Sequence, residues 1–245
     1  MKTKLIAITS AFFLTICSLQ LSAQEQEAYK DGLFKRFGVA VKAGTYGYGL
    51  DFHTSLTPNL KARVGFNHLS LNYDEIYDFN ADDVNGNIDP GVDGTFSNAR
   101  LKFPNANILL DFYPVKSGIF CITAGAYIGN NKIDVDGTAE APFLWDDIIV
   151  TPNPQGKFDG TLKMGNTIKP YLGFGLGRTI SKSRLSCRFD IGVVYQGKYT
   201  IESPQASGTA DGATVLKNQV DISDGLTDVL KLWPMMSFSI SYRIK

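Results

Sequence analysis

The sequence predicts an all-β fold: an eight-stranded antiparallel up-and-down transmembrane β-barrel with a short helix before its last strand. Apolar residues recur at every second position over eight stretches of the chain, which is the period of a strand with one apolar face. The stretches reach the ~9–11 residues that cross a bilayer, whereas strands of globular proteins average ~5–6. Short and long connections alternate between them, as in barrels with tight turns on one side of the membrane and loops on the other.

An N-terminal signal peptide is predicted over residues 1–23, which leaves residues 24–245 as one outer-membrane β-barrel domain. The run "MKTKLIAITSAFFLTIC" has a basic start and an apolar core, and Leu21-Ser22-Ala23 supplies the small residues of a cleavage site. Cys17 also allows a lipoprotein signal, although such signals place a small residue, and not Ile16, before the cysteine. We therefore expect the chain to be exported.

The composition limits the class of protein. Lys plus Arg equals Asp plus Glu at 24 each, so no net charge favours nucleic acid as a partner. No stretch after the signal approaches the ~18 consecutive apolar residues of a transmembrane helix. Cys121 and Cys187 remain after the signal, too few for a disulfide scaffold, and period two places them on opposite faces, so we expect no disulfide between them.

The first five strands are predicted at residues 36–44, 46–56, 59–73, 98–113 and 118–134. In each of them, as in "FGVAVK", "LKARVGFN" and "FCITAGAYI", apolar residues alternate with small, polar or charged ones. One face of every strand is therefore apolar.

The last three strands are predicted at residues 160–179, 184–200 and 234–245. Pro170 falls on the apolar face of the first of these, and Pro104 falls where an earlier strand changes phase. Because proline cannot donate a hydrogen bond to a strand ladder, each position requires a bulge or a local break.

The run "YLGFGLGR" places Gly173, Gly175 and Gly177 at every second position. A phosphate-binding glycine loop stands between a strand and a helix, but a polar turn and another strand pattern follow here, and the spacing is G-x-G-x-G. The glycines are therefore predicted to line the inner face of a strand, where neighbouring side chains need room.

Long external loops are predicted at residues 75–97, 135–159 and 201–233, while the first connection, at Gly44 and Thr45, is short on the same side. The end of the third loop, "VDISDGLTDVLKLWP", has apolar residues at helical spacing and stops at a proline. We expect a short amphipathic helix there, near residues 221–233, at the rim or inside the barrel.

The apolar faces are expected to meet lipid, while charged residues pair with one another in the narrow interior. The inner charges are Lys42, Asp51, Lys61, Arg63, Asp111, Lys169, Arg188, Asp190 and Arg243. Tyrosines near strand ends are expected to anchor at the membrane interface. These are Tyr46, Tyr73, Tyr113, Tyr127, Tyr195 and Tyr199. Side chains just fill an eight-stranded barrel, so no open diffusion channel is expected, although inner glycines leave a narrow path as an alternative.

Several runs, among them "PNANILLDFYPVKSGIFCITAGAYIGNNK", "KPYLGFGLGR", "RFDIGVVYQG" and "WPMMSFSISYRIK", resemble the small eight-stranded outer-membrane β-barrel proteins of Gram-negative bacteria, of the OmpW, OmpX and OmpA-barrel kind. The resemblance implies a location in the bacterial outer membrane. It also implies outer-membrane lipid, lipopolysaccharide and the barrel-assembly machinery as partners, with no cofactor. Such proteins commonly end in Phe or Trp, whereas this sequence ends Ile244-Lys245.

The leading functional hypothesis is a non-enzymatic membrane protein that acts through external loops or as a structural component, without catalytic, cofactor-binding or metal-binding residues. Three alternatives remain open. One is a narrow channel for small solutes, and another is a hydrolase that modifies lipid A. The third is a soluble exported barrel that binds an apolar ligand, which would need its apolar faces turned inward.

The hydrolase hypothesis rests on "FNHLSLNYDE", in which His68, Ser70 and Glu75 resemble the His-x-Ser pair and nearby Glu of outer-membrane lipid A deacylases. A serine near the membrane rim, activated by histidine, could attack an ester-linked acyl chain. The alternative interpretation is a structural polar pair near the rim.

A metal site is a further hypothesis for the loop "YDEIYDFNADDVNGNIDPGVDG", with Asp78, Asp82, Asp83 and Asp89 as candidate ligands. Calcium takes six to eight oxygen ligands, and such a loop could supply some of them. The EF-hand pattern fails, because Ile88 occupies its glycine position. A solvated external loop is the simpler interpretation.

Overall fold

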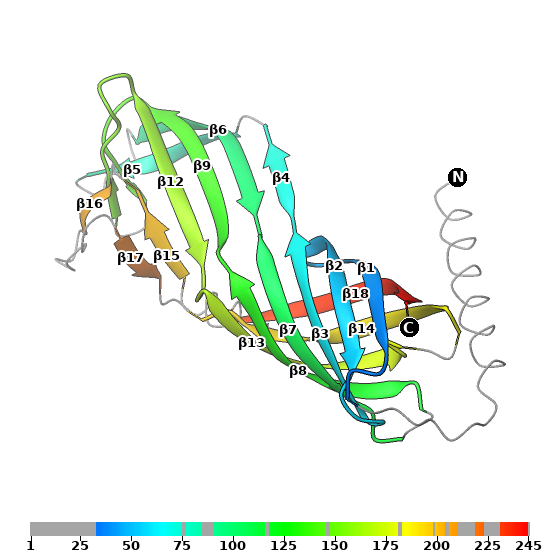
Figure 1. Ribbon diagram of the computed structural model, residues 1–245. Coiled ribbons are helices and arrows are strands. Elements are labelled where there is room, and N and C mark those ends of the chain that lie inside the picture. The colour runs from blue at the N-terminus through cyan, green and yellow to red at the C-terminus, as the bar shows by residue number, and fades with distance from the viewer. Residues whose placement is uncertain are drawn as a thin grey trace, which may run out of the picture.

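The computed structural model describes residues 33–74, 77–84, 91–115, 118–145, 148–180, 183–197, 199–203, 206–209, 219–222 and 231–244. The regular elements in these ranges are antiparallel β-strands, arranged in two sheets (Figure 1). Within the same ranges, no helix is both long and apolar enough to cross a membrane. The predicted all-β antiparallel class is therefore confirmed, whereas the predicted signal peptide at residues 1–23 lies outside the described residues.

The first sheet closes into a barrel of eight strands in the order β1-β18-β14-β13-β8-β7-β3-β2. Their bounds are β1 Phe37–Gly44, β2 Gly47–Ser55, β3 Leu60–His68, β7 Asn105–Phe112, β8 Phe120–Gly129, β13 Ile168–Gly177, β14 Leu185–Tyr195 and β18 Leu232–Arg243. Pairing of the first strand with the last, from Gly38↔Arg243 to Gly44↔Ser237, closes the barrel. Every other neighbouring pair is also antiparallel, so hydrogen bonds run around the whole circumference.

The second sheet, which we call the extension, prolongs the barrel at one end (Figure 1). Its strands are β4 Ser70–Tyr73, β5 Tyr77–Asp83, β6 Val92–Lys102, β9 Asn131–Ala139, β10 Phe143–Trp145, β11 Ile148–Val150, β12 Lys157–Met164, β15 Tyr199–Glu202, β16 Ala206–Thr209 and β17 Gln219–Ile222. The chain passes directly from β3 into β4, from β8 into β9 and from β12 into β13. We call the opposite end, where β2–β3, β7–β8 and β13–β14 are joined, the turn end.

The prediction of long loops at residues 75–97, 135–159 and 201–233 is wrong for most of their described residues, which form strands of the extension or, at Leu232 and Trp233, the start of β18. In the first two stretches the cause is a second apolar core formed by Val92, Ala139, Phe143, Val150 and Phe158, against which Phe79 and Phe96 pack. The Phe79 ring lies 4.7 Å from the Phe96 ring and 5.3 Å from the Phe143 ring, between centroids. Aromatic burial of this size orders segments that sequence alone presents as polar loops.

The helix predicted near residues 221–233 is not seen at the described ends of that segment. Asp221 and Ile222 belong to β17, which pairs with β15, and Leu232 begins β18. Residues 223–230 lie outside the described residues. Pairing with a neighbouring strand edge therefore overrides the helical spacing at both ends.

The two prolines occupy breaks in the ladders. Pro104 lies between β6 and β7. Pro170 pairs with Ala126 on one side, whereas the ladder with β14 begins one residue later, at Tyr171↔Val194. The expected local break is thus present at both positions, and for Pro170 it is the end of one ladder.

The glycines of "YLGFGLGR" line the inner face as predicted, because the residues between them are exposed and their own positions are buried. A Cβ at Gly175 would lie 2.6 Å from Nη2 of Arg188 and 2.7 Å from Sγ of Cys121. Gly177 has φ of +112°, which disfavours any other residue. The space beside Gly175 is therefore taken by the Arg188 guanidinium.

Gly175→Ala is expected to lower the free energy of unfolding by about 1–3 kcal/mol, because the added methyl group overpacks the interior against a fixed guanidinium. Denaturant titration of the detergent-refolded protein measures the change. Gly160→Ala is the matched control, since a Cβ at Gly160 would meet no atom within 4 Å. Equal effects of the two substitutions would contradict the tight packing at Gly175.

Candidate functional site: a filled lumen inside an apolar belt

Arg188 is the centre of a charge cluster inside the barrel. Its guanidinium lies 3.0 Å from Asp111 and 2.6 Å from Asp190, and it is 1% exposed. It also donates to the hydroxyls of Thr123, at 2.9 Å, and Thr179, at 2.6 Å. Period two on β7, β8 and β14 turns Asp111, Thr123 and Asp190 inward, and Thr179 follows the end of β13, so that every guanidinium nitrogen of Arg188 finds an acceptor.

Arg63 extends the cluster toward the extension. Its guanidinium lies 2.9 Å from Asp111, 3.3 Å from Asp190 and 3.7 Å from Asp51. Asp51 in turn pairs with Lys42 at 2.5 Å. The cluster therefore joins three cations with three carboxylates, which neutralise one another across the lumen.

Three of the predicted inner charges lie apart from these pairs. Lys61 is buried near the turn end, with Nζ 3.4 Å from the carbonyl oxygen of Thr57. Lys169 is buried nearer the extension and donates to Oδ1 of Asn105 at 3.1 Å. Arg243 is only half-buried, because it ends β18 and lies at the rim of the turn end. The predicted interior position is confirmed for the two lysines and wrong for Arg243.

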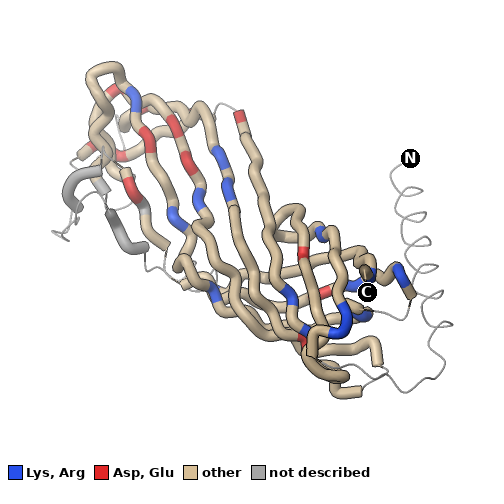
Figure 2. Tube along the Cα trace, in the orientation of Figure 1, with Lys and Arg blue, Asp and Glu red and all other residues tan. Residues whose placement is uncertain are grey.

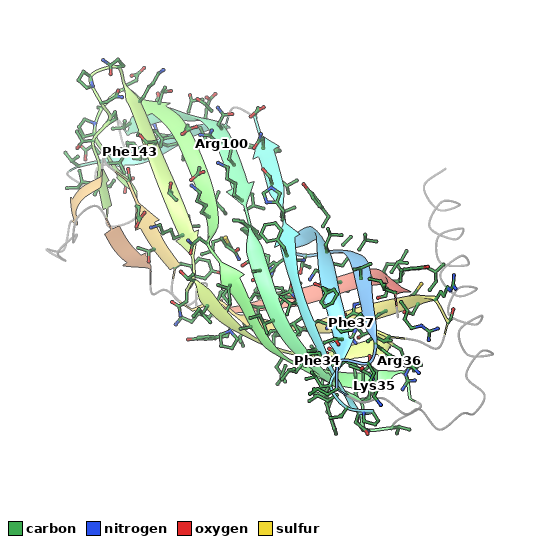
Figure 3. The ribbon with its side chains drawn as sticks, in the orientation of Figure 1. Phe34, Lys35, Arg36, Phe37, Arg100 and Phe143 are labelled. Atoms are coloured by element: carbon green, nitrogen blue, oxygen red, sulfur yellow. The ribbon has the colours of Figure 1, made fainter. Side chains whose placement is uncertain are left out.

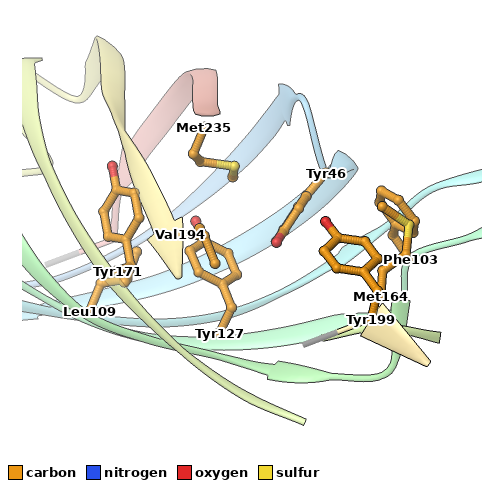
Figure 4. Packing of buried hydrophobic residues seen from close by; sticks show 9 residues of the cluster. All are labelled: Tyr46, Phe103, Leu109, Tyr127, Met164, Tyr171, Val194, Tyr199 and Met235. Carbon is orange, nitrogen blue, oxygen red and sulfur yellow. The ribbon is translucent and has the colours of Figure 1, made fainter. Parts of the chain in front are cut away.

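Tyr46 closes the lumen at the boundary between barrel and extension. It lies in the two-residue connection between Gly44 and Gly47, and its side chain is fully buried (Figure 4). The connection is fastened to the last barrel strand, because the backbone N–H of Thr45 donates to the carbonyl oxygen of Met236 at 2.9 Å. This explains why the first connection is short on the long-loop side: it folds over the barrel mouth.

An aromatic layer, which we call the plug, surrounds Tyr46. Its buried members are Tyr46, Phe103, Leu109, Tyr127, Met164, Tyr171, Val194, Tyr199 and Met235 (Figure 4). The Tyr46 ring meets the Phe103 and Tyr127 rings edge to face, with centroids 5.9 and 5.3 Å apart. Such packing of side chains from strands around the whole circumference fills the lumen above the charge cluster.

The prediction that strand-end tyrosines anchor at the membrane interface is wrong for Tyr46, Tyr113, Tyr127 and Tyr199, which are at most 3% exposed. The period-two pattern of β8 turns Tyr127 inward, whereas Tyr46 is brought inward by the connection that folds over the barrel mouth. The hydroxyl of Tyr113 accepts a hydrogen bond from Arg188 at 2.9 Å. Tyr73 and Tyr195 are exposed, as an interfacial role requires.

The outer face of the barrel is a continuous band of exposed apolar side chains, which we call the apolar belt. Each of its side chains is aliphatic or aromatic, and each is 36–65% exposed. They are Val39, Val41, Leu50, Phe52, Val64, Phe66, Ile108, Leu110, Phe112, Phe120, Ile122, Ile128, Ile168, Leu172, Phe174, Leu176, Leu185, Ile191, Val193, Tyr195, Met236, Ile240 and Tyr242. An exposed apolar surface on all eight strands far exceeds what soluble monomers carry.

The extension instead presents charges of both signs along its strands (Figure 2). Arg100 lies 2.8 Å from Asp136, and Lys163 lies 2.6 Å from Glu202. Asp134 accepts hydrogen bonds from Lys132, Thr161 and Lys102; although partial burial acts in the opposite direction, these bonds hold the pKa of its carboxyl below the usual range. Water is therefore the solvent that suits this surface.

The two cysteines lie on the faces predicted for them. Cys121 is buried inside the barrel, whereas Cys187 is partly exposed on the outer face, and neither forms a disulfide bond.

The candidate hydrolase residues are found near the junction of barrel and extension. His68 ends β3, and its ring stacks on Phe66 and meets Tyr48 edge to face, with centroids 6.4 and 6.0 Å away. Ser70 begins β4 and is exposed. Glu75 lies outside the described residues, so the triad stays a prediction.

The candidate metal ligands are spread along one strand. Asp78, Asp82 and Asp83 belong to β5, and Asp78 accepts a hydrogen bond from the Thr95 hydroxyl at 2.9 Å. Within the described ranges, no three His, Cys, Asp or Glu side chains are grouped to hold a metal ion. Asp89 lies outside these ranges, so the loop site also stays a prediction.

No protein-family model and no curated protein matches the chain. Among solved structures, the chain is similar to CarO2 of Acinetobacter baumannii, with 20% identity and a TM-score of 0.49 over 87% of this chain and 100% of that chain. For CarO of the same organism the values are 19%, 0.49, 86% and 99%. For a major outer membrane protein from Thermus thermophilus they are 17%, 0.36, 85% and 98%. These similarities alone assign neither a family nor an activity.

Arg188→Gln is expected to lower the free energy of unfolding by about 3–5 kcal/mol, because it removes one of the buried cations that pair with Asp111 and Asp190. Denaturant unfolding in detergent micelles measures the loss. The control is Lys163→Gln, which removes a pair that is half exposed and therefore contributes at most about 1 kcal/mol. Similar losses in the two variants would show that the inner cluster is solvated.

Proposed function

We propose that the chain is a non-enzymatic β-barrel protein of a bacterial outer membrane, which acts through its extension or as a structural component of the bilayer. The observation that carries the proposal is the apolar belt, which surrounds a closed barrel whose charges face inward. In water this arrangement would expose apolar side chains on every barrel strand. In a bilayer the same side chains meet lipid, and the closed ladder leaves no unpaired strand edge.

The distribution of charge and the connections support an orientation. The charged extension lies beyond one end of the belt, and short connections lie at the other (Figure 2). Outer-membrane barrels have short periplasmic turns and long extracellular segments. The extension is therefore proposed to face the exterior, and the turn end to face the periplasm. The relation to barrels of the OmpW, OmpX and OmpA kind remains an expectation from the sequence.

The contents of the lumen favour a surface role over transport. Arg188 and Tyr46, at two different levels of the barrel, are both less than 2% exposed. A soluble barrel that binds an apolar ligand would need an apolar interior, and the charge cluster argues against one. The hydrolase alternative stays a prediction: His68 packs on the rings of Tyr48 and Phe66 at the outer face, and Glu75 lies outside the described residues.

Membrane fractionation tests the proposal. The protein is expected in the outer-membrane fraction and to require detergent for extraction, because the apolar belt is not soluble in water. Without heating it should migrate differently on gels from the heated chain, since the closed ladder resists detergent. As a control, Leu172→Glu and Phe174→Glu together should reduce insertion by charging the belt. A fully soluble protein with unchanged migration on heating would contradict the proposal.

Conductance in planar bilayers separates the surface role from a narrow channel. The wild-type protein is expected to give no discrete conductance steps. Tyr46→Ala should also stay silent, because the charge cluster of Arg63 and Arg188 still fills the lumen below the plug. Steps from the wild type would favour the channel alternative, and steps from Tyr46→Ala alone would show that the plug is the only barrier.

A further inference from the structure

A cationic cavity of about 450 Å³ lies at the turn end of the barrel, where three strand ends meet. The described residues that line it are Lys35, Arg36, Arg184, Tyr242, Arg243 and Ile244, four cations and no acid. Lys35 and Arg36 precede β1, as Figure 3 shows, and the backbone N–H of Arg243 donates to the carbonyl oxygen of Arg184 at 2.8 Å. The strand pairing that closes the barrel thus gathers these cations at one place on its rim.

An apolar groove of about 530 Å³ runs over the apolar belt on β18, β1, β2 and β3. Val41, Leu50, Val64, Ile240 and Tyr242 are among the side chains that line it. Tyr242 lines the cationic cavity as well, and Leu185, which follows Arg184 in the chain, also lines the groove. The two hollows therefore share a wall, with the charged one at the strand ends and the apolar one beside it, across β18, β1, β2 and β3.

We infer that the cavity and the groove form one binding site for a phospholipid with an anionic, phosphate-bearing headgroup, in the leaflet at the turn end. This inference rests on the proposed membrane insertion. Guanidinium and ammonium groups at the strand ends match the phosphate, since arginine presents paired donors to its oxygens. The groove then receives an acyl chain of the same molecule, which lies on the apolar belt across these strands.

The charge balance favours a lipid over a neutral amphiphile. Lys35 and Arg184 bring positive charge to one cavity, and an anionic headgroup there is attracted to both, whereas a neutral one is not. The apolar groove favours a lipid over free phosphate as the ligand, because inorganic phosphate has no apolar part to fill the groove. Phosphatidylglycerol and phosphatidylcholine with identical acyl chains are therefore suitable probes, since they differ in net charge and headgroup alone.

Native mass spectrometry of the full chain in detergent, with both lipids at equal concentration, tests the inference. The wild type is expected to retain phosphatidylglycerol over phosphatidylcholine. The double variant Lys35→Gln with Arg184→Gln should bind phosphatidylglycerol about 25-fold more weakly, at about fivefold for each cation removed near an anionic headgroup. Lys132→Gln, which removes a charge in the extension, is the matched control and should leave the preference unchanged.

The groove is tested with separate variants. They keep the inference testable if the double variant Lys35→Gln with Arg184→Gln does not fold. Val41→Trp should fill the groove and weaken retention of both lipids, whereas Leu172→Trp on another part of the belt should not. Displacement of the lipid by inorganic phosphate at similar concentration, or equal retention of both lipids by a correctly inserted wild type, would overturn the inference. A wild type that does not change its gel migration on heating would instead overturn the proposed function.

Discussion

Arg188 is held between Asp111 and Asp190 inside a barrel whose outer face is apolar, and this buried ion cluster constrains the rest of the structure. Without Asp111 and Asp190, the buried guanidinium of Arg188 would have neither water nor a carboxylate beside it, and such a charge costs several kcal/mol. The inner positions of β3, β7, β8 and β14 must therefore present cations, carboxylates and hydroxyls in matching register. Since side chains alternate along a strand, the outer positions of the same strands are left to apolar residues.

Filling the lumen is also a matter of volume. A guanidinium in a narrow barrel needs room, and the bare backbone at Gly175 supplies it beside Arg188. Nearer the extension, the Tyr127 ring of β8 packs edge to face against Tyr46 of the folded-over connection and against Tyr171 of β13. The lumen is thus closed at two levels, by the ion cluster and by the rings of the plug. Both layers need the same strand register, so the packing of each stabilises the arrangement of the other.

The barrel strands could be predicted from the sequence, because apolar residues at every second position indicate which side chains form the outer face. The same pattern placed Asp111 and Gly175 inside. It could not show that Tyr46 and Tyr127 pack together, because strand-end tyrosines look alike whether they face an interface or a lumen. The extension was missed for a related reason: Phe79 and Phe143 lie in polar segments far apart in the sequence, and only long-range packing orders them.

Because the ion cluster in the lumen is neutral as a whole, the protein's outer surfaces are left as the places where it can act. Lys42, Arg63 and Arg188 are matched by Asp51, Asp111 and Asp190, so the interior presents no net charge from this cluster to attract an ion. At the rim, by contrast, Lys35 and Arg184 share a cavity lined by no described acid. Charges that pair inside stabilise the fold, whereas charges that gather on a surface beside an apolar groove are suited to a partner. We therefore expect binding partners to be recognised at the extension and at the rim of the barrel, while the packed lumen stabilises the barrel that carries both surfaces.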